Sequence, residues 1–158
     1  MSEMQTKSGS AQQRLQDLGL ELPAVRPGSP YENHRAVDSS VYVAGQLPYK
    51  DGELLGTGIV GDDVDVETAR ELARHAALNA LAVAAEAVGD LERVRMVQML
   101  VFVASTPDLG LQSRVADAAS DLLREVLGEN GRHARTAIGV AGLPLNSPVE
   151  IQMVCTAA

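Results

Sequence analysis

The sequence predicts an α+β fold, a two-layer sandwich in which two helices cover a mixed β-sheet. Three observations lead to this prediction. Short runs rich in β-branched or alternating apolar residues, typical of strands, occur toward both ends of the chain. Two longer segments carry apolar residues at the helical spacing of three and four. One further apolar run separates these two segments, so the element order is β-β-α-β-α-β-β.

The composition is that of one globular domain with an aliphatic core. The chain has 158 residues, of which 46% are hydrophobic and 22% charged, with one Phe and no Trp. Its net charge of −8 argues against nucleic acid as a main partner, because phosphate neutralisation needs clustered Lys and Arg. No segment has the length of apolar sequence that a membrane span or a signal peptide requires. We therefore expect a cytoplasmic protein, and a single cysteine, Cys155, agrees with a reducing compartment.

Residues 1–30 are expected to form an N-terminal extension, partly disordered, ahead of a domain at residues 31–158. The first ten residues are polar or small, with few apolar side chains to order them. Leucines at helical spacing, followed by Gly19, predict a short helix at about residues 11–19. Leu22–Pro30 contains three prolines and is predicted to be an extended connector or a flap.

The first strand signal lies in residues 31–46, where S-S-V-Y-V-A-G-Q is rich in β-branched residues. The next segment, Lys50–Glu53, has the sequence of a tight turn. We therefore predict a hairpin whose returning arm is Glu53–Val60. Glycines within and just after this arm predict an irregular sheet edge.

The central part of the chain predicts two helices with a strand between them. Asp62–Val88 is the clearest helix, and either Asp63 or Asp65 can cap its N-terminus. Its apolar stripe is mostly alanine, which allows close packing. A second amphipathic helix is predicted from about Leu111 to Leu127. Leu91–Ala104 begins with alternation and ends in a continuous apolar run, which favours a central strand buried on both faces at its end.

The closing segments, Thr136–Leu143 and Val149–Thr156, are predicted to be two more strands. A turn at Pro144–Pro148 would join them as a hairpin, with Arg135 and Glu150 near opposite ends of the ribbon. Only further folding or another subunit would then bring these two charges together. The two helices leave one face of the sheet uncovered, and strand alternation makes that face partly hydrophobic, so we expect another subunit to cover it.

Three short motifs follow one another along the chain: A-G-Q-L-P at residues 44–48, H-A-R-T-A at 133–137 and L-P-L-N-S-P-V-E at 143–150. Taken together, they resemble the RidA/YjgF family, whose members are also named endoribonuclease L-PSP-like. An L-x-x-L-G-x-x-L-P opening at 15–23 and G-R-H-A-R at 131–135 resemble a longer branch of this family. The resemblance implies a chorismate-mutase-like fold and a homotrimer with ligand clefts between subunits. It also implies hydrolysis of a small carboxylate-bearing enamine or imine to a 2-oxo acid and ammonia, with no metal and no organic cofactor.

The resemblance assigns roles to individual residues of this cleft. Arg135 matches the arginine that grips the substrate carboxylate, and Glu150 matches the glutamate associated with the attacking water. Tyr31 is placed where the family has a tyrosine that lines the cleft. Three further residues are expected to contribute to substrate binding: Gly45, His133 and Asp117. The residue patterns alone also allow plainer interpretations, in which the charged residues are solvated and the tyrosine is a capping aromatic.

The histidines outside these motifs do not predict a metal site. His34 and His75 have no acidic or cysteine partners at the spacing of metal ligands. His75 falls on the same helix face as Glu71, away from the apolar stripe, and is expected to be solvated. His133, in contrast, is placed to titrate near neutral pH and to assist Arg135.

The sequence also departs from the pattern of the deaminase branch. Ala44 stands where that branch has a serine, Ala137 where it has a cysteine, and His133 where it has a proline. Ala116 and Asp117 occupy the region of an asparagine on the second helix. Two alternatives to deamination therefore stay open: a non-catalytic trimer that binds a small carboxylate, and a specialised pathway enzyme with a reshaped cleft. The acidic charge balance disfavours endoribonuclease activity.

Overall fold

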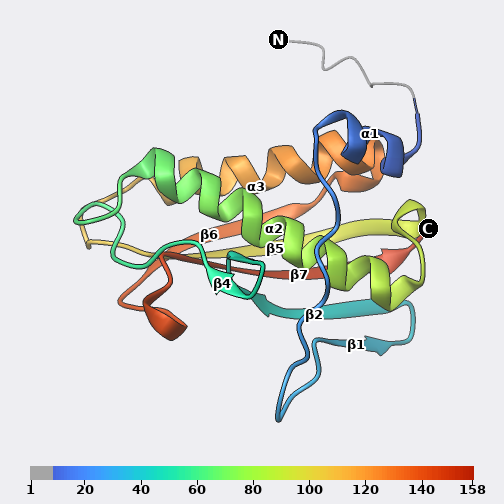
Figure 1. Ribbon diagram of the computed structural model, residues 1–158, viewed down its shortest axis with the longest axis horizontal. Helices are drawn as coiled ribbons and strands as arrows, with labels where there is room; N and C mark the ends of the chain where they lie inside the picture. Colours follow the sequence, from blue (N-terminus) through green and yellow to red (C-terminus); the bar gives the residue numbers. More distant parts are fainter. Residues whose placement is uncertain (1–8) are drawn as a thin grey trace.

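The computed structural model describes residues 9–158 and has the predicted two-layer α+β architecture (Figure 1). Its main sheet has five strands in the order β1-β2-β7-β5-β6. The bounds of these strands are β1 His34–Val37, β2 Ser40–Gln46, β5 Val94–Ala104, β6 Ala134–Val140 and β7 Val149–Ala157. Strand β6 is parallel to β5 and the other neighbours are antiparallel, so the sheet is mixed.

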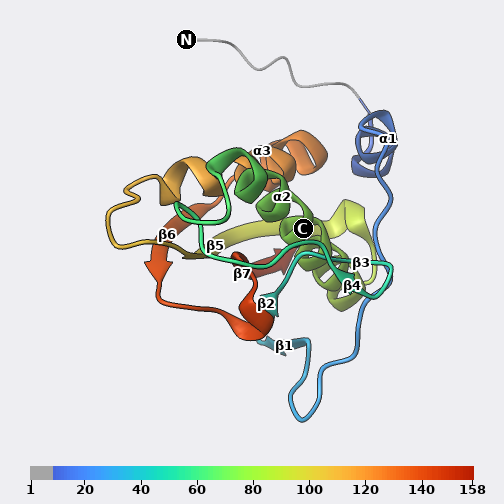
Figure 2. The same ribbon diagram turned by 60° about the vertical axis from the view of Figure 1, so that its left-hand side comes forward.

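Two long helices lie side by side on one face of this sheet and leave the other face uncovered (Figures 1 and 2). They are α2 (Val66–Val88) and α3 (Gln112–Leu127). A short helix, α1 (Ala11–Asp17), packs beside α3, close to the predicted position of the short N-terminal helix. The predicted order β-β-α-β-α-β-β is thus confirmed for the main sheet and its two covering helices. No helix within residues 9–158 combines the length and the apolarity needed to cross a membrane.

Alanine allows α2 to lie close against the sheet. Its N-terminus is capped by Asp65, which accepts a hydrogen bond of 2.7 Å from the Thr68 amide, while Asp63 bonds the Ile59 amide instead. Gly89 ends the helix in the left-handed conformation, with φ of 88°. Fully buried positions recur on its inner face, at Ala69, Ala73, Ala76 and Ala80. The sequence-predicted apolar stripe is therefore the packing surface of α2.

The hydrophobic core lies between the helices and the sheet. It is built from aliphatic side chains such as Leu81, Leu122, Met99 and Met153, each with no exposed surface. Cys155 is buried among them, and burial raises the pKa of its thiol to about 11. The N-terminal helix contributes to this same core through Ala11 and Leu15. Disorder was expected up to about Ser10, but Ser10 caps α1 by accepting a hydrogen bond from the Gln13 amide, and residues 1–8 lie outside the described residues.

The predicted pairing of the last two strands as a hairpin is wrong. Strand β5 lies between β6 and β7, and its Met99 is the register partner of both Arg135 in β6 and Met153 in β7. The segment between β6 and β7 includes a short 3₁₀ turn, Pro144–Asn146, and crosses the end of β5. The apolar run of β5 gains more burial at an interior position of the sheet, between β7 and β6, than it would at an edge.

The first predicted hairpin is only partly correct. A turn does form at Asp51 and Gly52, both with positive φ, but it joins two-residue strands, β3 (Tyr49–Lys50) and β4 (Glu53–Leu54). Residues 55–60 do not form a strand. The main sheet instead begins with β1 and β2, which pair with each other across a turn at Asp38. Two further 3₁₀ turns, Leu91–Arg93 and Gly128–Gly131, precede β5 and β6.

Candidate functional site

The two charges predicted to carry the chemistry lie on opposite faces of the sheet. Arg135 pairs with Met99, whose side chain is in the core, so the Arg135 side chain emerges on the helix side. Glu150 precedes the buried Ile151 and therefore emerges on the uncovered side. One copy of the chain cannot bring both groups onto one small molecule.

On the helix side, α3 holds the Arg135 guanidinium in place. Nη1 of Arg135 donates to Asp117 Oδ1 at 2.8 Å and to Ser120 Oγ at 3.2 Å. Only 22% of the arginine side chain is exposed. Its Nε and Nη2 groups make no hydrogen bond to any residue in the described part of the chain. These two donors form the side of the guanidinium that binds a carboxylate in a bidentate manner.

His133 is connected to Arg135 through Ser120. Its Nε2 lies 2.9 Å from Ser120 Oγ, and its Nδ1 lies 2.7 Å from the Gly131 carbonyl oxygen. Because a carbonyl can only accept, Nδ1 carries a proton, and neutral His133 then accepts from the Ser120 hydroxyl at Nε2. The chain of hydrogen bonds runs from Arg135 to Ser120, to His133 and to Gly131. His133 therefore contacts the arginine through Ser120, a residue that the sequence reasoning missed although it lies one helical turn after Asp117.

These side chains line a shallow, positively charged depression of about 580 Å³. Its lining residues are Asp117, Ser120, Asp121, Arg124, Arg132, His133 and Arg135. Three arginines against two aspartates make this a local concentration of positive charge in a chain of net charge −8. The side chain of Arg132 is 68% exposed and pairs with Glu129 at 3.0 Å. Of these two arginines, Arg135 is therefore the better positioned to bind a carboxylate.

On the uncovered face, the Glu150 carboxylate lies against Gly45. A Cβ atom placed on Gly45 would be 2.0 Å from Glu150 Oε1, so any side chain at that position would displace the carboxylate. Strand β2 has a register shift between Val43 and Gln46 at this point. Partial burial raises the pKa of Glu150 above its usual range. Glycine at this position therefore provides the space that the glutamate occupies.

Tyr31 does not reach Arg135 within one copy. It is 60% exposed and lies in the loop before β1. Strands β1 and β6 are the two opposite edges of the sheet, so the width of the sheet separates Tyr31 from Arg135. The structure thus brings Arg135, Asp117 and His133 together, places Gly45 with Glu150, and leaves Tyr31 across the sheet from Arg135.

The expectation that His75 is solvated is wrong. Its ring is partly buried, and Nε2 lies 2.9 Å from the Tyr49 carbonyl oxygen in the β3–β4 hairpin. Burial lowers the pKa of His75, which favours the neutral ring. Among residues 9–158, no three His, Cys, Asp or Glu side chains are grouped so that they could hold a metal ion.

Known proteins resemble this chain over nearly its whole length. The family described as "YjgF/chorismate_mutase-like, putative endoribonuclease" matches residues 12–156. Protein TCP17 of Trypanosoma cruzi is 42% identical over 147 residues, which cover 91% of this chain and 92% of that protein. The chain in a crystal structure from Agrobacterium tumefaciens is 41% identical, with a TM-score of 0.87, and the match covers 94% of this chain and 92% of that chain. Another, a "putative endoribonuclease" from Shewanella oneidensis, is 33% identical, with a TM-score of 0.90 and coverages of 94% and 99%.

Proposed function

The chain belongs to the YjgF/chorismate-mutase-like (RidA) family, and from this premise we propose that it hydrolyses a small carboxylate-bearing enamine or imine to a 2-oxo acid and ammonia. The observation that carries the proposal is the Arg135 guanidinium. Asp117 and Ser120 fix one side of it, while Nε and Nη2 are left to bind a carboxylate.

In the proposed reaction the protein positions a substrate that is already reactive. An enamine such as 2-aminoacrylate takes a proton at carbon to become an imine, whose carbon is electrophilic. Glu150 orients a water molecule toward that carbon and accepts a proton as the C–O bond forms. That proton passes to nitrogen, which gives a carbinolamine. The hydroxyl proton then also moves to nitrogen as the C–N bond breaks, so that ammonia leaves and the C=O bond of the 2-oxo acid forms. Arg135 holds the carboxylate throughout, which fixes the imine carbon relative to the water.

A second copy of the chain is needed to complete this site. Because Arg135 and Glu150 face opposite sides of the sheet, the cleft would combine Arg135 of one copy with Glu150 and Tyr31 of another. The uncovered face is suited to such a contact, since it exposes large apolar side chains, among them Tyr42 (49%) and Ile138 (41%). We expect a homotrimer, in which each interface contributes one cleft.

Turnover of 2-aminoacrylate or 2-iminobutyrate by the purified protein tests this function. Either compound is generated in situ by a pyridoxal-phosphate-dependent dehydratase, and release of the 2-oxo acid is followed beyond the spontaneous rate. We expect the protein to accelerate release in proportion to its concentration. Equal rates with and without the protein would reject the proposal.

Substitution of Gly45 by alanine is expected to lower kcat/KM about tenfold without unfolding the protein. The added Cβ would meet Glu150 Oε1 at 2.0 Å, and the flexible end of that side chain can turn away. The carboxylate then no longer orients water. Gly142→Ala is the matched control, because a Cβ at Gly142 meets nothing within 4 Å. Equal activity in the two variants would show that the position of Glu150 does not matter.

Activity should also be lost on acidification, at a higher pH than it would be if Glu150 had the ordinary pKa of a glutamate. Burial raises the pKa of Glu150, and the ionised form is the one that accepts a proton from water. The rate is therefore present above this raised pKa and lost as pH falls through it. For stability the sign is opposite, because a raised carboxyl pKa stabilises the fold at low pH and this contribution is lost as pH rises through it. A Glu150→Gln variant should lack the acidic limb of the rate profile, and a profile identical to the wild type would contradict the role.

The second candidate is a trimer that binds a small carboxylate without turnover. It is favoured by Ala44, next to Gly45 in β2, because an alanine there lacks the hydroxyl group that the serine of the deaminase branch would supply. The small side chains of Ala44 and Ala137 would equally allow a cleft reshaped for a larger substrate. Thermal stabilisation by keto or aromatic acids that are not consumed would support binding alone.

A further inference from the structure

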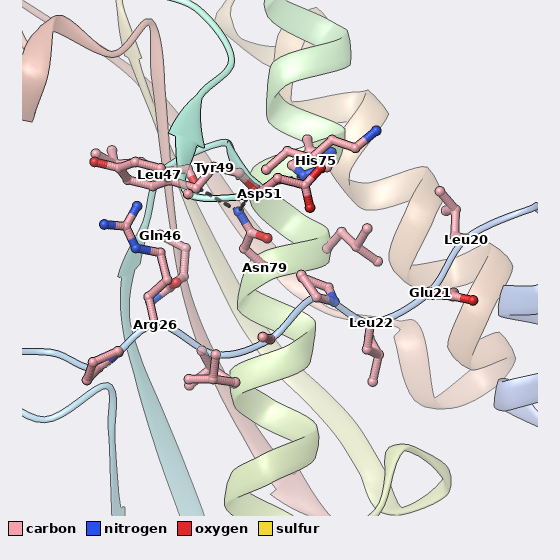
Figure 3. A pocket seen from close by; sticks show the side chains of 18 of the residues that line it. Leu20, Glu21, Leu22, Arg26, Gln46, Leu47, Tyr49, Asp51, His75 and Asn79 are labelled. Atoms are coloured by element: carbon pink, nitrogen blue, oxygen red, sulfur yellow. Dashed lines mark hydrogen bonds between the residues drawn. The ribbon is translucent and has the colours of Figure 1, made fainter.

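A second pocket, which we call the connector pocket, lies against α2, between the connector and the β3–β4 hairpin. It has a volume of about 920 Å³ and is formed by residues 19–27, by α2 and by the segment 46–52 that contains the β3–β4 turn (Figure 3). Leu20, Leu22 and Val25 of the connector pack against the hydrophobic core, so this wall of the pocket is fixed. The volume is within the range of small-molecule sites. None of its lining residues belongs to the depression around Arg135.

Two side chains of α2 present hydrogen-bond acceptors to this pocket. Asn79 Nδ2 donates to the carbonyl oxygens of Leu47 and Tyr49, each at 2.9 Å, so its amide oxygen points away from the hairpin (Figure 3). His75 Nε2 must likewise donate to the Tyr49 carbonyl oxygen, which leaves Nδ1 of the neutral ring as an acceptor. Neither Asn79 Oδ1 nor His75 Nδ1 bonds another described residue. Since no buried side-chain N or O atom in residues 9–158 lacks a partner, both acceptors are accessible.

The ionisable groups around these acceptors are balanced in charge. Glu21 and Asp51 line the pocket together with Arg26 and Lys50, in contrast to the positive depression around Arg135. Arg26 lies over the Tyr49 ring at 3.6 Å from its centroid, so this cation is already engaged and Lys50 is the cation left to face a ligand. A balanced set of charges favours a zwitterion over a net anion.

We propose that the connector pocket binds a free α-amino acid with an apolar side chain. Its ammonium group donates to Asn79 Oδ1, His75 Nδ1 and the Asp51 carboxylate, and its carboxylate lies next to Lys50. Its side chain packs on the leucines of the connector and on Leu78 of α2. Because α2 also carries the core of the fold, occupation of this pocket would stabilise the chain independently of the site at Arg135.

Titration of the full chain with L-leucine, followed by isothermal calorimetry and by amide chemical shifts, tests the proposal. We expect saturable binding, with shifts confined to residues 19–27, 46–52 and 75–83. The matched analogues 4-methylpentanoate, which lacks the amine, and isopentylamine, which lacks the carboxylate, should each bind at least about tenfold more weakly, as expected for one lost charge-assisted hydrogen bond.

Three variants separate this pocket from the site at Arg135. Lys50→Gln should weaken leucine binding about tenfold, because it removes the cation that faces the carboxylate. Arg95→Gln makes the same change of charge outside the pocket and should bind as the wild type does. Arg135→Ala should also bind as the wild type does. No binding, loss of binding in Arg135→Ala, or unchanged binding in Lys50→Gln would each overturn the proposal.

Discussion

Substitution of Arg135 by alanine is expected to lower kcat/KM for 2-aminoacrylate about a thousandfold. In the proposed site the substitution removes two charge-assisted hydrogen bonds to the substrate carboxylate, each worth roughly 2 kcal/mol, and about 4 kcal/mol corresponds to a factor near 10³. The fold should persist, since Arg135 lies on an edge strand and its partner Asp117 is 55% exposed and can be rehydrated. Steady-state kinetics and circular dichroism, measured on the same preparations, give both quantities.

Two companion variants show whether the effect depends on the guanidinium. Arg135→Lys keeps the charge but loses the bidentate geometry, so it should recover only part of the activity. Arg132→Ala removes an exposed charge from the same depression and should change kcat/KM less than threefold, as expected for a rim charge. An equal loss in Arg132→Ala and Arg135→Ala would mean that the depression acts only through its overall positive charge.

The helices and the element order could be predicted from the sequence because they depend on local patterns. The alanine stripe and Gly89 define α2, and the continuous apolar run at the end of Leu91–Ala104 indicates the central strand β5. Strand pairing depends on contacts between residues that are distant in the sequence. Proximity along the chain predicted a hairpin of β6 and β7, but β5 is inserted between them. The same limitation hid the pairing of β1 with β2.

The error in strand pairing also affected the expected site. In a hairpin, Arg135 and Glu150 would be far apart along one ribbon, whereas in the sheet they are on opposite faces. Which face each occupies follows from their register with Met99 and Phe102, and no local pattern contains that register. His75 was misjudged for a related reason. Its partner is a backbone carbonyl oxygen of Tyr49, and only the folded hairpin places it against α2.

The first residue of the G-R-H-A-R motif explains how the arginine is positioned. Gly131 is buried against the last turns of α3, and a Cβ atom there would lie 2.3 Å from the Leu123 carbonyl oxygen and 3.0 Å from Arg124 Cα. Its own carbonyl oxygen accepts from His133 Nδ1. The close approach of this glycine to α3 therefore fixes the start of β6, and with it Arg135, relative to Asp117 and Ser120.

Substitution of Gly131 by alanine is accordingly expected to destabilise the fold by about 3 kcal/mol, a large effect for a single methyl group. The clash is with helix backbone, so no side-chain rotation relieves it, and α3 and β6 must move apart. The expected fall in Tm is roughly 6–12 °C, measured by differential scanning calorimetry at fixed protein concentration. Gly142→Ala is the control, because it makes the same change in the unfolded chain. In the folded chain a Cβ at Gly142 meets nothing within 4 Å, so this variant should leave Tm nearly unchanged. If both variants unfold at the same temperature, the contact between Gly131 and α3 does not determine the position of β6.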